Sequence, residues 1–312
     1  MVITRRGFLT TLAIAVGRDR LDGLDGGRDG LRAASSAAGP AYRAAPAPKF
    51  GYAAITWGAN VTQAIDDISA VGFRGIQLRS EAFAQFGDRP AALRELLERH
   101  RLKMAVLSSG NLSIDPAKEQ SEIATHVSHA KFVKAVGGEY LQVIDERPKV
   151  RAIVAEDYRR LGRLLTKLGQ RTADEGVPLV YHHHMNSLGE KPDEVAAVLD
   201  AADRHHVRLL FDVAHYQQAG GDPVAAIRKY RDWIQVVHLK DVKSGAADGT
   251  YQFVELGQGR VDLPGVFAAL ADIKFDGWAI VELDRVPDPN RTPKEAAEIN
   301  KRYLTDRLHQ RI

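Results

Sequence analysis

The sequence predicts an α/β fold, a (β/α)8 (TIM) barrel that forms a single domain over residues 49–312. From Lys49 onward, short apolar runs alternate with longer stretches of helical spacing, and there are eight such pairs. The turn after the first run, Trp57-Gly58-Ala59-Asn60, lacks the glycine-rich phosphate fingerprint that a doubly wound open sheet normally carries there. Eight repeats over about 260 residues therefore favour the closed barrel.

The expected strands are the short apolar runs, and the expected helices are the longer stretches of helical spacing. Helix starts carry proline or aspartate, as at Pro90, Asp222 and Pro293, and helices run into glycine, as at Gly72 and Gly137. Strands are expected over residues 50–57, 75–78, 103–107, 140–144, 179–184, 208–212, 235–240 and 278–283. Helices are expected near 61–71, 90–100, 118–136, 155–175, 191–203, 222–231, 263–273 and 293–309.

Composition excludes several classes of protein. The chain has 312 residues, 45% of them hydrophobic, and no cysteine. Disulfides, thiolate metal sites and a cysteine nucleophile are thereby excluded. No uninterrupted apolar stretch reaches the roughly 18 residues that a membrane span needs, so we expect no stable membrane association.

The excess positive charge lies at the N-terminus. Residues 1–48 contain seven arginines and four aspartates, which accounts for the net charge of +3, and the remainder is balanced. A protein that binds nucleic acid usually carries its excess charge in the folded domain. We therefore expect no nucleic-acid partner.

Residues 1–48 read as a leader. Arg5-Arg6 is followed by Phe8-Leu9 and an apolar run to Gly17, which resembles a twin-arginine export signal. The Gly/Ala/Pro/Arg-rich remainder cannot bury enough surface to order itself. Export predicts a periplasmic or secreted protein, whereas a signal that does not function would leave the protein cytoplasmic.

Polar residues stand at the C-terminal ends of the expected strands, where the active site of such a barrel forms. Strand five ends in His182, His183 and His184, and strand four runs into Glu146. The last three strands end in Asp212, His238 and Glu282. Buried unpaired carboxylates and imidazoles are costly, and a shared divalent cation would satisfy them. Mixed imidazole and carboxylate ligands suit Mn, Co, Zn or Fe, so one such ion is expected.

Four segments in the C-terminal half carry a family resemblance: FDVAH, VVHLKD, LGQG and GWAIVELD. In this order they resemble the xylose-isomerase-like sugar phosphate isomerases and epimerases, and the triple histidine is similar to the inosose dehydratase branch. The resemblance implies one divalent metal, held by residues after strands five to eight. Its last three ligands fall on Asp212, His238 and Glu282.

The first ligand departs from the family pattern, because His182 stands where many relatives have glutamate. Strand alternation places His182 and His184 on one side and His183 on the other. His182 is one option for the fourth ligand. Glu146, reaching across from strand four, is the other, and the sequence leaves both open.

The resemblance implies an isomerase, epimerase or dehydratase that acts on a sugar, polyol or keto-sugar through a metal-stabilised enediolate. His184 is the first choice for the base, since histidine suits proton transfer near neutral pH. His215 and Lys240 are further candidates for acid/base or oxyanion roles. We expect Trp57, Arg79 and His183 to contact the substrate.

Two other classes of protein compete with an enzyme that acts on sugars. One is a non-catalytic sugar-binding barrel that keeps its metal. The other is an endonuclease IV-like phosphodiesterase, whose three metals need more ligands in the early strands. Strand two ends in Gln77-Leu78-Arg79 and strand three in Leu107-Ser108-Ser109, which supply none. The oligomeric state stays open, with a homo-oligomer as one option.

Overall fold

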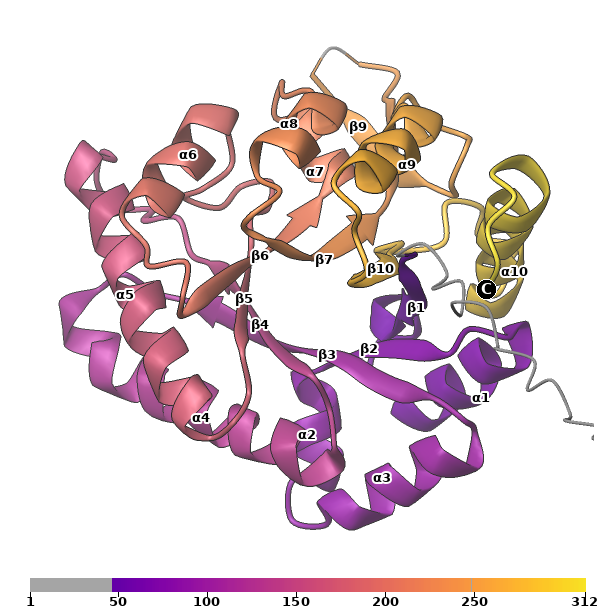
Figure 1. Cartoon of the computed structure of the whole chain (residues 1–312), viewed down its shortest axis with the longest axis horizontal. Helices are drawn as coiled ribbons and strands as arrows, with labels where there is room; N and C mark the ends of the chain where they lie inside the picture. The colour runs from indigo at the N-terminus through magenta and orange to yellow at the C-terminus, as the bar shows by residue number, and fades with distance from the viewer. Residues whose placement is uncertain (1–46, 248) are drawn as a thin grey trace, which may run out of the picture. The chain divides into compact units, whose positions relative to one another are not determined.

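A computed structural model describes residues 47–247 and 249–312. The predicted twin-arginine-like segment lies outside these residues. Eight parallel strands close into a barrel in the order β1-β10-β7-β6-β5-β4-β3-β2, which confirms the predicted fold class (Figure 1). The barrel strands are β1 (Lys49–Ala53), β2 (Gly75–Arg79), β3 (Lys103–Leu112), β4 (Tyr140–Asp145), β5 (Leu179–His182), β6 (Val207–Asp212), β7 (Ile234–Leu239) and β10 (Trp278–Val281).

Helices follow the strands and lie around the barrel (Figure 1). The helices that the sequence predicts are α1 (Val61–Val71), α3 (Pro90–Arg99), α4 (Glu119–Val136), α5 (Ala155–Asp174), α6 (Pro192–Asp200), α8 (Pro223–Lys229), α9 (Leu263–Asp272) and α10 (Pro293–Arg302). The described residues contain no helix long and apolar enough to cross a membrane.

Two short helices and a hairpin also lie in the loops that follow the strands. They are the short helices α2 (Ser80–Phe86) and α7 (Val213–Gln218) and an antiparallel hairpin of β8 (Asp241–Ser244) and β9 (Tyr251–Val254). The sequence did not predict them, because each is too short to show a clear period. Strand β5 also ends earlier than predicted, so His183 and His184 belong to the loop after it.

The barrel interior explains how polar side chains come together. Val180, Leu210, Val236 and Ile280 are fully buried and belong to one apolar cluster within the barrel. Side chains alternate between the two faces of a strand, so the residue two positions further along points the same way. On these four strands, the residues at that position are His182, Asp212, His238 and Glu282. A polar layer therefore lies directly on an apolar one.

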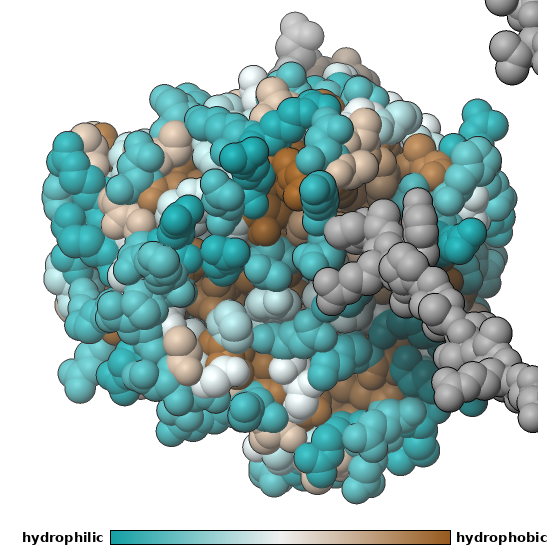
Figure 2. All heavy atoms as spheres, viewed as in Figure 1, coloured by the Kyte–Doolittle hydropathy of each residue, from teal (hydrophilic) through white to brown (hydrophobic). Residues whose placement is uncertain are grey.

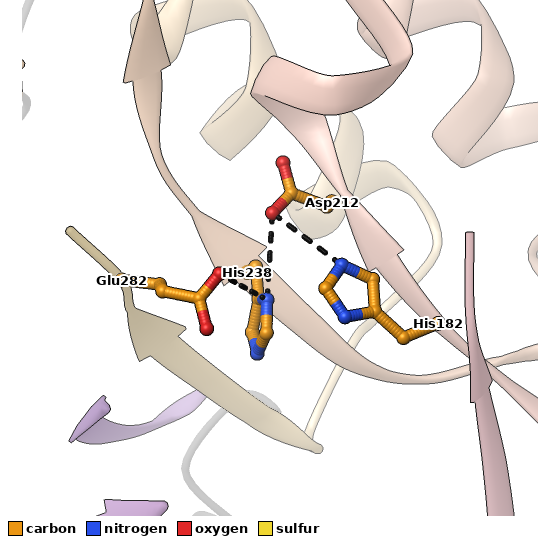
Figure 3. A group of neighbouring side chains, drawn as sticks. All are labelled: His182, Asp212, His238 and Glu282. Carbon is orange, nitrogen blue, oxygen red and sulfur yellow. Dashed lines mark ion pairs between the residues drawn. The ribbon is translucent and has the colours of Figure 1, made fainter. Parts of the chain in front are cut away.

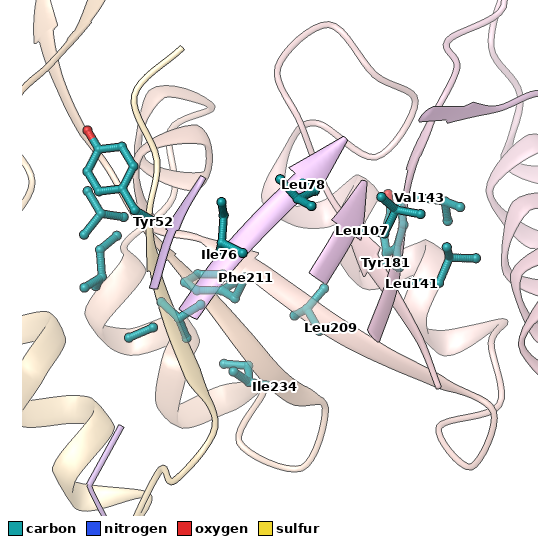
Figure 4. Packing of buried hydrophobic residues seen from close by; sticks show 14 of the residues in the cluster. Tyr52, Ile76, Leu78, Leu107, Leu141, Val143, Tyr181, Leu209, Phe211 and Ile234 are labelled. Carbon is teal, nitrogen blue, oxygen red and sulfur yellow. The ribbon is translucent and has the colours of Figure 1, made fainter. Parts of the chain in front are cut away.

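The outward faces of the strands pack against the helices. Tyr52, Ile76, Tyr181, Leu209 and Phe211 are fully buried in this second, larger cluster (Figure 4). The face shown in Figure 2 is mainly polar, with apolar residues visible between the polar side chains. Burial on both sides of the strands holds the polar layer in a rigid frame.

Candidate metal centre

Four side chains from neighbouring strands meet in the polar layer (Figure 3). His182 ends β5, Asp212 ends β6, His238 lies on β7 and Glu282 follows β10. Each offers one ligand-type atom, and these four atoms lie within 4.8 Å of one another. Nδ1 of His238 lies 3.4 Å from Oδ2 of Asp212 and 3.2 Å from Oε2 of Glu282. Nε2 of His182 lies 3.7 Å from the same Asp212 oxygen.

The electrostatics of this cluster favour a cation. Burial by itself would lower the pKa of His238, but the Glu282 and Asp212 carboxylates outweigh it and raise the pKa to about 9. Burial would raise the pKa of Glu282, yet His238 and Lys240 hold it well below its usual value. Burial lowers the pKa of His182 to about 4, so this ring is neutral at pH 7. The carboxylates are thus ionised and need positive charge beside them.

The donor atoms of the cluster fit a divalent metal. Nε2 of His182, Oδ2 of Asp212 and Nδ1 of His238 are buried and have no hydrogen-bond partner. Such atoms are rare in folded proteins because each costs the free energy of desolvation. Imidazole nitrogens and carboxylate oxygens together suit Zn, Mn, Fe or Co. The geometry therefore agrees with the metal-ligand set that the sequence predicts for Asp212, His238 and Glu282.

A chain of hydrogen bonds through Gln77 and Gln142 joins the two histidines of the cluster. Nε2 of His238 lies 2.9 Å from Oε1 of Gln77, and Nε2 of Gln77 donates to Oε1 of Gln142 at 3.0 Å. Nε2 of Gln142 lies 3.0 Å from Nδ1 of His182. The sequence pattern assigned no role to either glutamine. Each is a long polar side chain in the middle of an apolar strand, and this pattern could have identified them as candidates.

A cavity of about 390 Å³ opens onto the cluster, within the roughly 300–1,000 Å³ range of small-molecule sites. His182 and Glu282 lie in its wall, together with the predicted residues Arg79 and His184. Nδ1 of His184 lies 2.7 Å from the carbonyl oxygen of Met185. A carbonyl only accepts, so Nδ1 carries the proton and Nε2 keeps a free lone pair. His184 therefore has the tautomer that a base needs.

Lys240 and His215 lie behind the cavity wall. Both are at most 1% exposed, and neither lines the cavity. Nζ of Lys240 donates to Oε2 of Glu282 at 3.0 Å and to Oδ1 of Asp284 at 2.5 Å, under the ring of Phe253. Direct contact with the substrate, as predicted for both, does not agree with this burial. Lys240 instead positions the two carboxylates.

Three predicted site residues lie elsewhere. Nε1 of Trp57 donates to Asp67 at 2.8 Å, and Trp57 lines a different cavity from the one at the cluster, where the substrate contact was predicted. His183 is fully buried on the helix side against Phe211, since it has the opposite alternation to His182, and it does not line the cavity at the cluster, where it was predicted to contact the substrate. Glu146 lines a third cavity and is not part of the cluster. His182 is the fourth member of the cluster.

The Gly-x-Gly segment has a structural role. The buried carboxylate of Asp241 accepts backbone N–H groups from Val242, Gly257 and Gly259 at 2.9 Å and from Val261 at 3.1 Å. Gly257 has φ +81°, and a Cβ on Gly259 would overlap the Asp241 carboxylate. Both glycines let the loop wrap this carboxylate. Asp241 therefore ties the loop after the hairpin to the end of β7.

The fold and the cluster define a barrel protein with a candidate metal centre at the C-terminal ends of its strands. Residues 65–305 match the model of the xylose isomerase-like TIM barrel family. The chain belongs to this family, as its motifs predict. Relatives include inosose dehydratases of Lacticaseibacillus casei, 28% identical over 268 residues (78% of this chain and 88% of the relative), and Clostridium botulinum strain Alaska E43, 26% identical over 273 residues (78% and 89%).

Solved structures share the fold. A structure of the IolI protein with a bound zinc atom has a TM-score of 0.72 and 21% identity, covering 83% of this chain and 97% of that one. The 3-keto-D-glucoside 4-epimerase YcjR from E. coli has a TM-score of 0.68 and 16% identity, covering 83% and 100%. Family membership and these relatives support an enzyme that acts on sugars.

Proposed function

We propose that the protein is a divalent-metal-dependent isomerase, epimerase or dehydratase whose substrate is a sugar, polyol or keto-sugar. The observation that carries the proposal is the buried cluster of His182, Asp212, His238 and Glu282, of which His182 and Glu282 line a cavity. Asp212, His238 and Glu282 would hold the metal. A metal bound there supplies a Lewis acid that polarises the carbonyl and hydroxyl oxygens of the substrate.

The side chains of this protein supply the proton transfer. His184 lines the cavity and acts as the base. Its Nε2 takes the proton from the substrate carbon next to the carbonyl. The resulting enediolate is reprotonated in isomerisation or epimerisation, and it loses a neighbouring hydroxyl as water in dehydration. Arg79 and Arg285 line the same cavity and can donate hydrogen bonds to substrate hydroxyls. The inosose dehydratase relatives make a cyclic polyol ketone the first substrate class to test.

We expect the full chain to bind about one transition metal ion and to catalyse exchange of the proton beside a carbonyl. The protein is purified, dialysed and analysed for metals. It is then incubated in D2O with inosose, D-tagatose or a 3-keto-glucoside, and NMR follows deuterium incorporation. A chelator should stop the exchange, and the metal that was removed should restore it.

The same experiment separates the competing functions. Binding of one metal without exchange on any of these ketones would favour a sugar-binding barrel. Three metals per chain would favour the nuclease. The structure argues against the latter, because the described residues contain one group of three or more candidate ligands. Absence of metal binding would contradict the proposal itself.

We further propose that residues 1–48 direct export through the paired arginines Arg5 and Arg6. Export would favour a free sugar, polyol or glycoside over a phosphorylated substrate from inside the cell. Fusion of residues 1–48 to a reporter that folds before export should place the reporter outside the inner membrane. Replacement of both arginines by lysine should retain it in the cytoplasm. Equal export of the two fusions would contradict this proposal.

A further inference from the structure

The chain of hydrogen bonds from His238 through Gln77 and Gln142 to His182 has a direction, and that direction limits what the two histidines can do. Each glutamine amide presents an oxygen that accepts and a nitrogen that donates. All four side chains are at most 2% exposed, so their polar atoms are satisfied mainly by one another. If one end of the chain donates into it, the other end must accept from it.

This constraint on the two ends of the chain holds for either orientation of each glutamine amide. A neutral histidine that binds a metal through one ring nitrogen carries its proton on the other. If both histidines were ligands, both would donate into the chain. The amide nitrogens of Gln77 and Gln142 would then face each other, and one of the three hydrogen bonds would be lost. The intact chain therefore leaves only one of the two histidines with a lone pair toward the cluster.

The position of His238 decides the direction. Its Nδ1 lies between the carboxylates of Asp212 and Glu282, at 3.4 and 3.2 Å. With a metal on Nδ1, the neutral ring of His238 carries its proton on Nε2, so Gln77 must accept from it. Gln77 then donates to Gln142, and Gln142 donates to Nδ1 of His182. In the neutral ring, the proton of His182 is left on Nε2, which points toward Asp212 at 3.7 Å.

We propose that His182 faces the metal centre as an Nε2–H donor, that Gln142 fixes it in this tautomer, and that Asp212, His238 and Glu282 alone bind the metal. This inference rests on the metal site of the proposed function. Three protein ligands are typical of catalytic metal sites, where the remaining positions stay open to substrate. The N–H of His182 then stabilises the ionised Asp212 or an oxygen of the substrate.

The affinity for zinc tests the proposal without any assay of activity. Competition with a chromogenic chelator measures the dissociation constant of the full chain and its variants. His182→Ala should weaken zinc binding by less than about 10-fold, whereas Asp212→Asn should weaken it by more than about 100-fold. Equal losses for the two variants would overturn the proposal. A wild-type chain that binds no zinc would instead contradict the proposed function.

Gln142→Glu tests the role of the chain itself. A carboxylate accepts from both Gln77 and His182, so it moves the proton of His182 to Nδ1 and frees Nε2 as a fourth ligand. Zinc binding should tighten by about 10-fold or more. The added charge also attracts zinc, so the same change is made in the His182→Ala background, where the part of the gain that depends on His182 should disappear. Equal gains in both backgrounds would contradict the proposal.

NMR of 15N-labelled histidine gives a direct readout of the tautomer. In the zinc-loaded wild-type chain, His182 should carry its proton on Nε2, and in Gln142→Glu it should carry it on Nδ1. If the Gln142→Glu variant does not fold, the wild-type spectrum and His182→Ala still decide the matter. A proton on Nδ1 of His182 in the zinc-loaded wild-type protein would overturn the proposal.

Discussion

Replacement of Asp212 by asparagine should remove the metal while leaving the barrel folded. The variant keeps the side-chain oxygen that accepts the N–H groups of Ala214 and His215 at 2.9 Å, so α7 keeps its N-cap. It loses the charged oxygen nearest the cluster centre. We expect the metal affinity to fall by more than about 100-fold, since loss of an outer partner of a ligand alone costs roughly 10–100-fold.

The charges of the cluster explain why this variant should stay folded. Asp212, Glu282 and Asp284 face Lys240 and His238, so the metal-free centre has one more carboxylate than cations. Asp212→Asn balances these charges, and the thermal midpoint of the metal-free protein should fall little or even rise. Asp212→Ala additionally loses the cap, which is worth about 1 kcal/mol.

Asp222→Asn is the matched control. Asp222 caps α8 with the same geometry, accepting from Val224 at 2.9 Å and Ala225 at 3.1 Å, but it is not part of the cluster. This variant should retain the metal and the activity. If Asp212→Asn unfolds, Asp212 has a structural role only. The same conclusion follows if Asp212→Asn binds metal with the affinity of Asp222→Asn.

Replacement of His184 by glutamine should lower turnover by roughly 10²–10⁴-fold, the usual contribution of a positioned base. Glutamine can still donate to the carbonyl of Met185, so the loop should keep its shape. It cannot take a proton. Metal content should stay at the wild-type value, because His184 is not part of the cluster.

Deuterium exchange distinguishes the base from a residue that only shapes the cavity. Solvent deuterium should stop entering the carbon next to the carbonyl in His184→Gln. His205→Gln, at an exposed histidine in the loop before β6, should exchange like the wild type. Loss of metal in His184→Gln would make His184 a ligand instead. Unchanged exchange would remove it from proton transfer.

The sequence predicted the barrel and most of the cluster for one physical reason. Buried parallel strands are long apolar runs, and a polar residue at the end of such a run has few explanations. Asp212, His238 and Glu282 were found in this way, and the structure brings them together. Strand alternation also separated His183 from His182 correctly, although His183 was still expected at the substrate.

The errors have a physical cause as well. Trp57 and Glu146 follow strands of the same barrel, but they line other cavities. The hydrophobic pattern of a loop does not predict the direction in which the loop turns. The pairing of Gln77 with Gln142 joins positions 65 residues apart. A periodic pattern describes one segment at a time, so it cannot show a contact between two strands.

The carboxylate of Asp241 fixes the β8–β9 hairpin beside the barrel. Both the start of the β8–β9 hairpin and the loop that follows it are anchored at this carboxylate, so the hairpin returns to a fixed point beside β7. Tyr251 and Phe253 on β9 line a cavity of about 370 Å³ that shares Asp284 with the main one. The hairpin therefore borders the cavity next to the cluster from a fixed position. We expect a library that randomises residues 243–252, and so keeps Phe253 against Lys240, to alter specificity while Asp212, His238 and Glu282 stay in place.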